Sequence, residues 1–183
     1  SKLHGGKAIN RGRSTHTAQY TSPTMGGIKL VANTTFSGSE DETTGIGVRW
    51  SNKTITAYAD WIDGQNGEAT AAGGNTESAM KLGGKFSADA FSVALQYEDM
   101  EDWVGRNYLF AAGTFNIDAN NSVAVTYGQA SDEVGDNDHD GMAVAFNHKM
   151  SKMTNVYVGY GAHGEDADNQ DESMITAGIR KKF

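Results

Sequence analysis

Cysteine is absent from this 183-residue sequence, and proline occurs once. The lack of cysteine excludes a disulfide framework and a thiolate metal site. The sequence contains no run of about 18 apolar residues, which excludes a transmembrane helix. Only 38% of the residues are hydrophobic, and the mean hydropathy is −0.52. No segment shows a persuasive 3.6-residue period, so we expect little helix.

Positive charge is also scarce, with 15 Lys and Arg against 23 Asp and Glu, which gives a formal charge of −8. This balance argues against nucleic acid as a partner. The first six residues lack the apolar region of a signal peptide. We therefore expect either that a leader has been removed or that the sequence begins inside a longer protein. Residues 1–12 show no period and are expected to be the tail of a loop.

From residue 13 onward, apolar and polar residues alternate. This period of two is typical of strands that lie between an apolar and a polar medium. Most of the segments are 8–11 residues long, which suits tilted membrane strands of about 9–11 residues better than the strands of about 5–6 residues usual in soluble sheets. We count eleven segments, at 13–21, 27–37, 44–51, 55–63, 79–87, 91–98, 108–117, 121–129, 141–149, 154–163 and 173–183.

The connections between these segments alternate between short and long. In an up-and-down sheet, alternate connections lie at the same end, so one end has tight turns and the other has long loops. Short periplasmic turns and long extracellular loops are typical of outer-membrane barrels. The five long connections hold 18 of the 23 acidic residues and one basic residue, Arg106, and thus a formal charge of −17. They are residues 38–43, 64–78, 99–107, 130–140 and 164–172.

If the apolar face meets lipid, the polar face lines a lumen in which water solvates its side chains. The charged pore-lining candidates are Arg13, Lys29, Arg49, Asp60, Lys81, Lys85, Glu98 and Arg180. Aromatic residues near segment ends indicate the girdles that membrane barrels carry at both interfaces. The girdle candidates are Tyr20, Trp50, Trp61, Tyr97, Tyr127, Tyr160 and Phe183. Ordinary core aromatics are the alternative interpretation.

Three stretches resemble the Gram-negative general porins, which are trimeric, sixteen-stranded outer-membrane diffusion channels. Residues 17–27 resemble a mid-chain hairpin of that family, Tyr-x-Ser-Pro-x-Phe-Gly-Gly, with Met25 where Phe is usual. Residues 149–160 resemble the penultimate hairpin, with its Leu-Ser-Lys-Arg-Thr-x-x-Tyr pattern. Residues 177–183 resemble the terminal Gly-Leu-Arg-His-Lys-Phe. Together, the resemblance covers nearly all of residues 13–183.

The resemblance implies an all-β, antiparallel, transmembrane up-and-down barrel in the bacterial outer membrane. It implies passive transport of ions and small hydrophilic solutes, contact with the lipid bilayer and lipopolysaccharide, and a homotrimer. Eleven segments are fewer than the sixteen of the family, and no acidic constriction loop is found. We therefore expect the C-terminal portion of a sixteen-stranded barrel, completed by a missing N-terminal segment or by another chain, because lipid does not tolerate an unpaired strand edge.

Other functions have weaker signals. Residues 136–141 match the start of an EF-hand loop, but its position twelve is Asn147 instead of Glu, and no helix flanks it. A looser Ca²⁺ or Mg²⁺ site at Asp136, Asp138 and Asp140 remains open, and no other cofactor is expected. The histidines lack paired zinc-ligand spacing, and Gly-x-Ser-x-Gly does not occur. The alternatives to a channel are a soluble all-β ligand-binding domain and an outer-membrane barrel enzyme.

Overall fold

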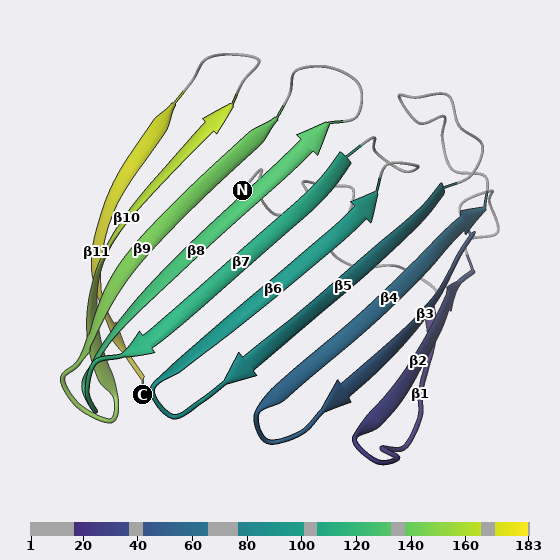
Figure 1. The fold of residues 1–183 in the computed structure, drawn as a ribbon, viewed down its shortest axis with the longest axis horizontal. Helices are drawn as coiled ribbons and strands as arrows, with labels where there is room; N and C mark the ends of the chain where they lie inside the picture. The colour runs from purple at the N-terminus through teal and green to yellow at the C-terminus, as the bar shows by residue number, and fades with distance from the viewer. Residues whose placement is uncertain are drawn as a thin grey trace.

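The computed structural model describes residues 17–36, 42–65, 77–100, 106–132, 138–165 and 171–182. These residues form a single sheet whose eleven strands follow one another in sequence order, each antiparallel to the next (Figure 1). The strands are β1 (Thr17–Thr21), β2 (Ile28–Thr35), β3 (Glu42–Ser51), β4 (Ile55–Gln65), β5 (Glu77–Ser87), β6 (Phe91–Met100), β7 (Arg106–Asn116), β8 (Asn121–Asp132), β9 (His139–Lys149), β10 (Thr154–Glu165) and β11 (Glu172–Lys181).

The structure confirms all eleven expected strands, and it lengthens most of them at one end. At the short-turn end, observed and expected bounds agree within one residue for β2 to β10. At the long-loop end, each of the strands from β3 to β10 runs two or three residues further than expected. The apolar pattern stops there although the hydrogen-bonded ladder continues. Acidic residues assigned to long connections from the sequence, such as Asp99, Asp132 and Asp140, therefore lie in strands.

The turns at the short end are held by local hydrogen bonds. The side-chain oxygen of Asn52 accepts bonds from the backbone N–H groups of Thr54 and Ile55, at 2.8 and 2.7 Å. Asp118 does the same for Asn120 and Asn121, at 2.7 and 2.9 Å. Asn and Asp favour tight turns because their side chains can bond to backbone groups two or three residues further on. These bonds explain why the turn bounds were predictable from sequence.

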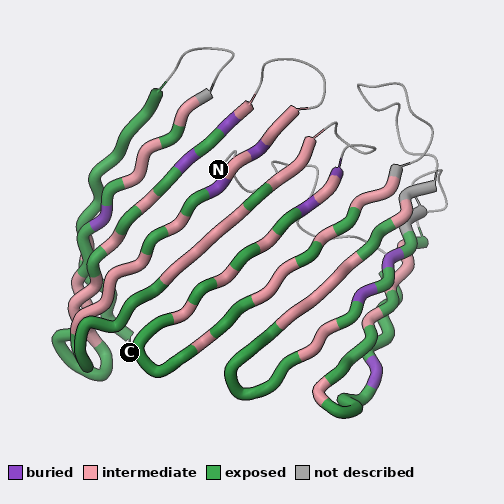
Figure 2. Tube along the Cα trace, in the orientation of Figure 1, coloured by how far each residue is buried: buried purple, intermediate pink, exposed green. Residues whose placement is uncertain are grey.

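The sheet is one layer thick and has almost no core. Among the described residues, Met100 and Ala130 are the only buried hydrophobic side chains, at 4% and 1% exposure. Large apolar residues remain exposed along the strands; Leu95 is 57% exposed and Ile179 is 67% exposed. Figure 2 shows that few positions along the described strands are buried. Since no second layer covers them in the described part of the chain, these side chains need an apolar environment outside the protein.

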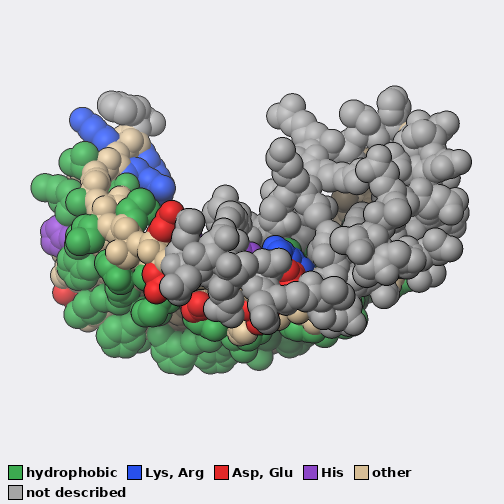
Figure 3. All heavy atoms as spheres, turned by 90° about the horizontal axis from the view of Figure 1, so that it is seen from above, with side chains coloured by type: hydrophobic (Ala, Val, Ile, Leu, Met, Phe, Trp, Pro, Cys, Tyr) green, Lys and Arg blue, Asp and Glu red, His purple; other side chains and the backbone are tan. Residues whose placement is uncertain are grey.

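The sheet curves into an open trough, and hydrophobic side chains follow its convex outline (Figure 3). Within the described residues, β1 pairs only with β2 and β11 only with β10. Each outer strand therefore has unpaired backbone groups along one side. No described helix has the length and apolar character needed to cross a membrane.

Candidate functional site: the polar face of the sheet

The strand register sorts the side chains into two faces, because residues directly opposite each other on paired strands share a face. One row runs through Val48, Ala59, Leu82, Tyr97 and Leu109. We call this side the apolar face. The neighbouring row on the other side, which we call the polar face, runs through Asp60, Lys81, Glu98 and Tyr108.

The polar face collects the charged residues that were predicted to line a pore. The register places Lys29 opposite Arg49, Asp60 opposite Lys81, and Lys81 opposite Glu98. Lys85 and Arg180 lie on the same face through their partners Thr56 and Asn155. Arg13 lies outside the described residues. Seven of the eight candidates therefore share one face of the sheet.

Arg49 and Asp60 form an ion pair at 2.5 Å between β3 and β4. The second guanidinium nitrogen of Arg49 donates to Asp60 at 2.8 Å, and the first donates to the backbone oxygens of Val48 and Ala59 at 3.1 and 3.4 Å. The guanidinium carbon lies 5.3 Å from the ring centre of Tyr58, within cation–π range. The Arg49 side chain is therefore fixed along the wall.

A second network crosses β4, β5 and β6. The Lys81 ammonium lies 2.9 Å from a Glu98 carboxylate oxygen, which also accepts a 2.6 Å bond from the amide of Gln96. The Tyr58 hydroxyl donates to the side-chain oxygen of Gln96. These bonds join three neighbouring strands through side chains, in addition to the backbone ladder. The carboxylate of Glu98 thereby gains partners at a site where the residue is only 6% exposed.

A third ion pair joins Arg106 and Asp132, which lie opposite each other on β7 and β8. The guanidinium contacts both carboxylate oxygens, one of them at 2.8 Å. Sequence analysis missed this pair because it assigned both residues to long acidic connections. A signal was available. The residues on the apolar face of both strands have odd numbers, whereas 106 and 132 are even, which puts both residues on the polar face.

Glycine allows two polar side chains to lie flat against the wall. A Cβ atom at Gly83 would collide with the ring of Tyr58, and one at Gly47 would collide with the Asp60 carboxylate and lie 2.9 Å from Arg49. Both glycines directly face these neighbours in the register, Gly83 opposite Tyr58 and Gly47 opposite Asp60. A hollow of about 260 Å³ lies beside Gly47 on the polar face, over strands β1 to β6, and Arg49 and Asp60 also line it.

The predicted girdle residues lie on the apolar face. Trp61, Tyr97, Tyr127 and Tyr160 each sit three to five residues from the long-loop end of their strands. Each of these residues lies two residues closer to the short-turn end than the register row of the one before it; the row of Trp61, for example, reaches β6 at Asp99, two residues from Tyr97. Tyr20 shares the row of Trp61, whereas Trp50 lies near the short-turn end. Phe183 lies outside the described residues.

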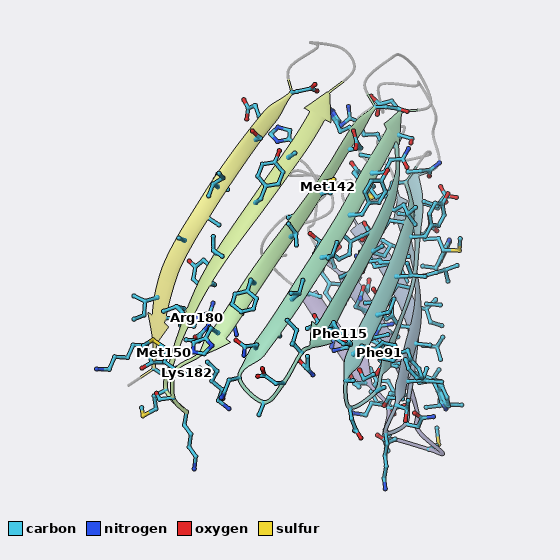
Figure 4. The ribbon with its side chains drawn as sticks, turned by 60° about the vertical axis from the view of Figure 1, so that its left-hand side comes forward. Phe91, Phe115, Met142, Met150, Arg180 and Lys182 are labelled. Atoms are coloured by element: carbon cyan, nitrogen blue, oxygen red, sulfur yellow. The ribbon has the colours of Figure 1, made fainter. Side chains whose placement is uncertain are left out.

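Phe183 was the one phenylalanine that sequence analysis included in a girdle, although other phenylalanines occupy the short-turn end of the apolar face. Phe91 and Phe115 are cross-strand partners there, and Figure 4 shows both near the lower end of the sheet. The rings of Phe86 and Phe91 are 5.7 Å apart. The signal was available, since these residues directly flank the short turns. The predicted girdle residues near the other end are Trp and Tyr, whose polar groups suit a wet boundary.

The structure brings no metal cluster together among the residues it describes, where no group of three or more His, Asp and Glu side chains is placed to hold an ion. Asp138 accepts a 2.9 Å bond from the backbone N–H of Asp132, and Asp140 lies opposite Gln129 on β8. Asp136 falls outside the described part of the chain. A divalent-ion site in this connection remains a prediction.

A single-layer sheet with one apolar face, one charged and hydrogen-bonded face and short turns at one end is the wall of a membrane β-barrel. The sequence matches the family model described as Gram-negative porin over residues 1–168. The chain therefore belongs to the Gram-negative porins, a family of the bacterial outer membrane. No protein of curated function matches it in sequence.

Solved structures of outer-membrane proteins share the fold. The anion-selective porin from Comamonas acidovorans is 14% identical, with a TM-score of 0.74 over 91% of this chain and 59% of that one. OmpT of Vibrio cholerae, an outer membrane protein folded in vitro, is 12% identical, with a TM-score of 0.60 over 90% of this chain and 63% of that one. The chain thus spans about six tenths of the length of these proteins.

Proposed function

We propose that this chain forms part of the wall of a passive, water-filled channel for ions and small hydrophilic solutes. The observation that carries the proposal is the opposite chemistry of the two faces. The apolar face exposes residues such as Leu95, whereas the polar face holds Arg49, Lys81 and Glu98 in ion pairs that are partly open to solvent. Lipid suits the first face, and only water or protein partners can satisfy the second.

The alternatives gain no support. A soluble all-β domain would expose the whole apolar face to water, which soluble monomers avoid on this scale. The family match favours a channel over an enzyme, and the described side chains of the polar face form ion pairs and amide hydrogen bonds.

The test is conductance of the full-length protein in a planar lipid bilayer. A channel should extract only in detergent and give stepwise current increases on insertion. Protein that stays in solution after membranes are pelleted, or that inserts without conducting, would contradict the proposal.

We further propose that strands beyond the described sheet, or from another chain, close the barrel, and that closed barrels assemble as trimers. The unpaired sides of β1 and β11 support closure. Hydrogen exchange of the full-length protein tests it, because closure should protect the amides of β11 as strongly as those of β6. Fast exchange confined to β1 and β11 would contradict closure, and a native mass other than three chains would contradict the trimer.

A further inference from the structure

The three ion pairs of the polar face that contain Lys or Arg share an asymmetry, because in each the acid is deeper than the base. The fourth contact, between His163 and Glu172 at 3.6 Å, joins side chains that are 42% and 69% exposed and does not follow it. The side chains of Arg49 and Asp60 are 38% and 25% exposed. Those of Lys81 and Glu98 are 32% and 8% exposed, and those of Arg106 and Asp132 are 30% and 9% exposed. A solute that moves along this face therefore meets the cationic partner first, although each pair is formally neutral.

Local bonds hold the acids in the wall. Glu98 is fixed by Lys81 and by the 2.6 Å bond from Gln96, and Asp132 by the two-point contact with Arg106. The bases keep unused capacity, because an ammonium has three donors and a guanidinium has five. Lys81 and Arg106 are therefore held by the acids in the wall and retain donors that can point to the open side of the polar face.

Bases that form no ion pair within the described part of the chain extend this pattern. Lys29 lies directly opposite Arg49 on the same face, although like charges in that position destabilise a sheet. Asn155 on β10 lies between Lys149 on β9 and Arg180 on β11, so two more bases flank β10 near the short-turn end, where Figure 4 shows Arg180. Among described strand side chains, the polar face holds seven bases, Lys29, Arg49, Lys81, Lys85, Arg106, Lys149 and Arg180, and four acids, Asp60, Glu98, Asp132 and Glu172.

The bases on β2 to β7 form a descending series. Relative to the row of Lys81, Arg106 lies one row closer to the long-loop end of the sheet. Arg49 and Lys29 lie one row closer to the short-turn end, and Lys85 lies one row further in that direction. Successive rows on one face are roughly 6.6 Å apart along a strand, which is shorter than the screening length of about 8–10 Å at physiological salt. An anion can therefore pass from the field of one base into that of the next.

We propose that this polar face is an anion-conducting rail, and that the channel prefers small anions, including carboxylate solutes, over cations of the same size. This inference rests on the proposed channel function and names its solute class. It runs against the formal charge of −8 of the whole chain, because that charge resides mainly in the long connections. The preference follows from this chain's own side chains, since 14% identity to the Comamonas porin establishes a shared fold alone.

The acidic connections give the proposal a specific dependence on salt. At about 0.01 M salt the Debye length is about 30 Å, so the acidic end repels anions before they reach the rail. At about 1 M it falls to about 3 Å, and only groups that touch the passing ion still act. The ratio of chloride to potassium permeability should therefore rise with salt concentration. A channel governed by its acidic mouth would prefer potassium at low salt and would lose this preference at high salt without coming to favour chloride.

The test is the reversal potential of the full-length protein in a planar bilayer under a KCl gradient. The wild-type protein should favour chloride at high salt, and the double variant Lys29→Gln/Arg49→Gln should lower the permeability ratio on the order of threefold, because both charges act at the wall. The matched control is Lys53→Gln/Lys152→Gln, which removes two charges from short turns at the same end and should leave the ratio nearly unchanged.

Each outcome decides between the alternatives. A wild-type preference for potassium at high salt, or an equal response of both double variants, would overturn the rail. A protein that never conducts would contradict the channel function itself. A measurement on the wild type alone guards against a misfolded variant: millimolar succinate should reduce the chloride current more than putrescine of equal concentration does. Stronger block by putrescine would overturn the proposal.

Discussion

Leu95 and Ala94 are neighbours in β6, yet they lie in different solvents. Leu95 belongs to the apolar face and is 57% exposed, whereas Ala94 lies on the polar face between Lys85 and Ala112. In a soluble protein the two faces of a sheet differ because one is buried. Here neither face has a core behind it, so the outside medium decides what each position tolerates. The two faces should therefore respond differently to the same substitution.

The largest contrast is expected for a charge placed on each face. Leu95→Arg puts a guanidinium in the middle of the lipid-facing band and should lower the free energy of unfolding by about 2–4 kcal/mol. Ala94→Arg, one residue away, adds the same group to the polar face and should cost far less. Urea titration of folding into lipid vesicles measures both. Equal losses would show that the faces do not meet different solvents.

Within the polar face, more deeply buried acids should contribute more to the free energy of unfolding. Glu98→Ala removes the deeper carboxylate and leaves Lys81 and Gln96 without their partner, at a cost of about 1–2 kcal/mol. Asp60→Ala breaks a more exposed pair and should cost less than about 1 kcal/mol. The same titration compares them. A larger loss for Asp60→Ala would contradict the ranking by depth.

Glycines on the two faces should also differ. Gly83→Ala displaces the Tyr58 ring from the wall, which breaks its bond to Gln96 at a cost of about 1 kcal/mol and narrows the lumen. Gly84→Ala points to the apolar face, where the nearest backbone oxygen would be 3.4 Å from the new methyl group. Single-channel conductance should fall for Gly83→Ala and stay near the wild-type value for Gly84→Ala. The reverse order would place Tyr58 on the lipid side.

The smallest effect is expected at a turn, outside both faces. The side chain of Asn121 and the backbone N–H groups of Asn120 and Asn121 donate to Asp118 and lower the pKa of its carboxyl below the ordinary 3.8. A lowered pKa in the folded state means that this stabilisation is present above pH 3.8 and is lost as the pH falls through the lower folded value. The stability gap between wild type and Asp118→Ala should therefore shrink below about pH 3.8.

The control for this titration is Asp89→Ala, in a neighbouring short turn where the carboxylate makes no hydrogen bond among the described residues. At neutral pH, the loss of stability caused by Asp89→Ala should be smaller than the loss caused by Asp118→Ala. A gap for Asp118→Ala that does not depend on pH would mean that the turn bonds do not require the ionised carboxylate.

Sequence patterns predicted the fold and the sorting of faces because both depend on a local period. Alternation fixes which residues share a face of a strand, and Asn52 and Asp118 mark where the chain turns. The partners within the polar face were not predictable in the same way. Whether Arg106 meets Asp132 depends on the stagger between two strands and on where the ladder ends. The apolar pattern had already stopped at both residues, so they looked like loop positions.

The girdle was predicted in part for a related reason. Trp61 and Tyr97 were recognised because Trp and Tyr are typical of membrane interfaces. Phe91 and Phe115 carry no polar group that would separate them from ordinary lipid-facing residues, and only their place beside the turns distinguishes them. The proposed anion preference also required the structure, since the formal charge of the sequence says nothing about which partner of an ion pair lies closer to the open side.

The stagger of the girdle residues has a geometric consequence for transport. Trp61, Tyr97, Tyr127 and Tyr160 shift by two residues for every two strands, a slope of one residue per strand. With a rise of about 3.3 Å per residue and a strand spacing of about 4.8 Å, this slope corresponds to strands tilted by roughly 35° from the axis. A solute that moves parallel to the barrel axis does not follow one strand, because the strands are tilted. It passes several hairpins in turn, so no single hairpin determines which side chains it contacts.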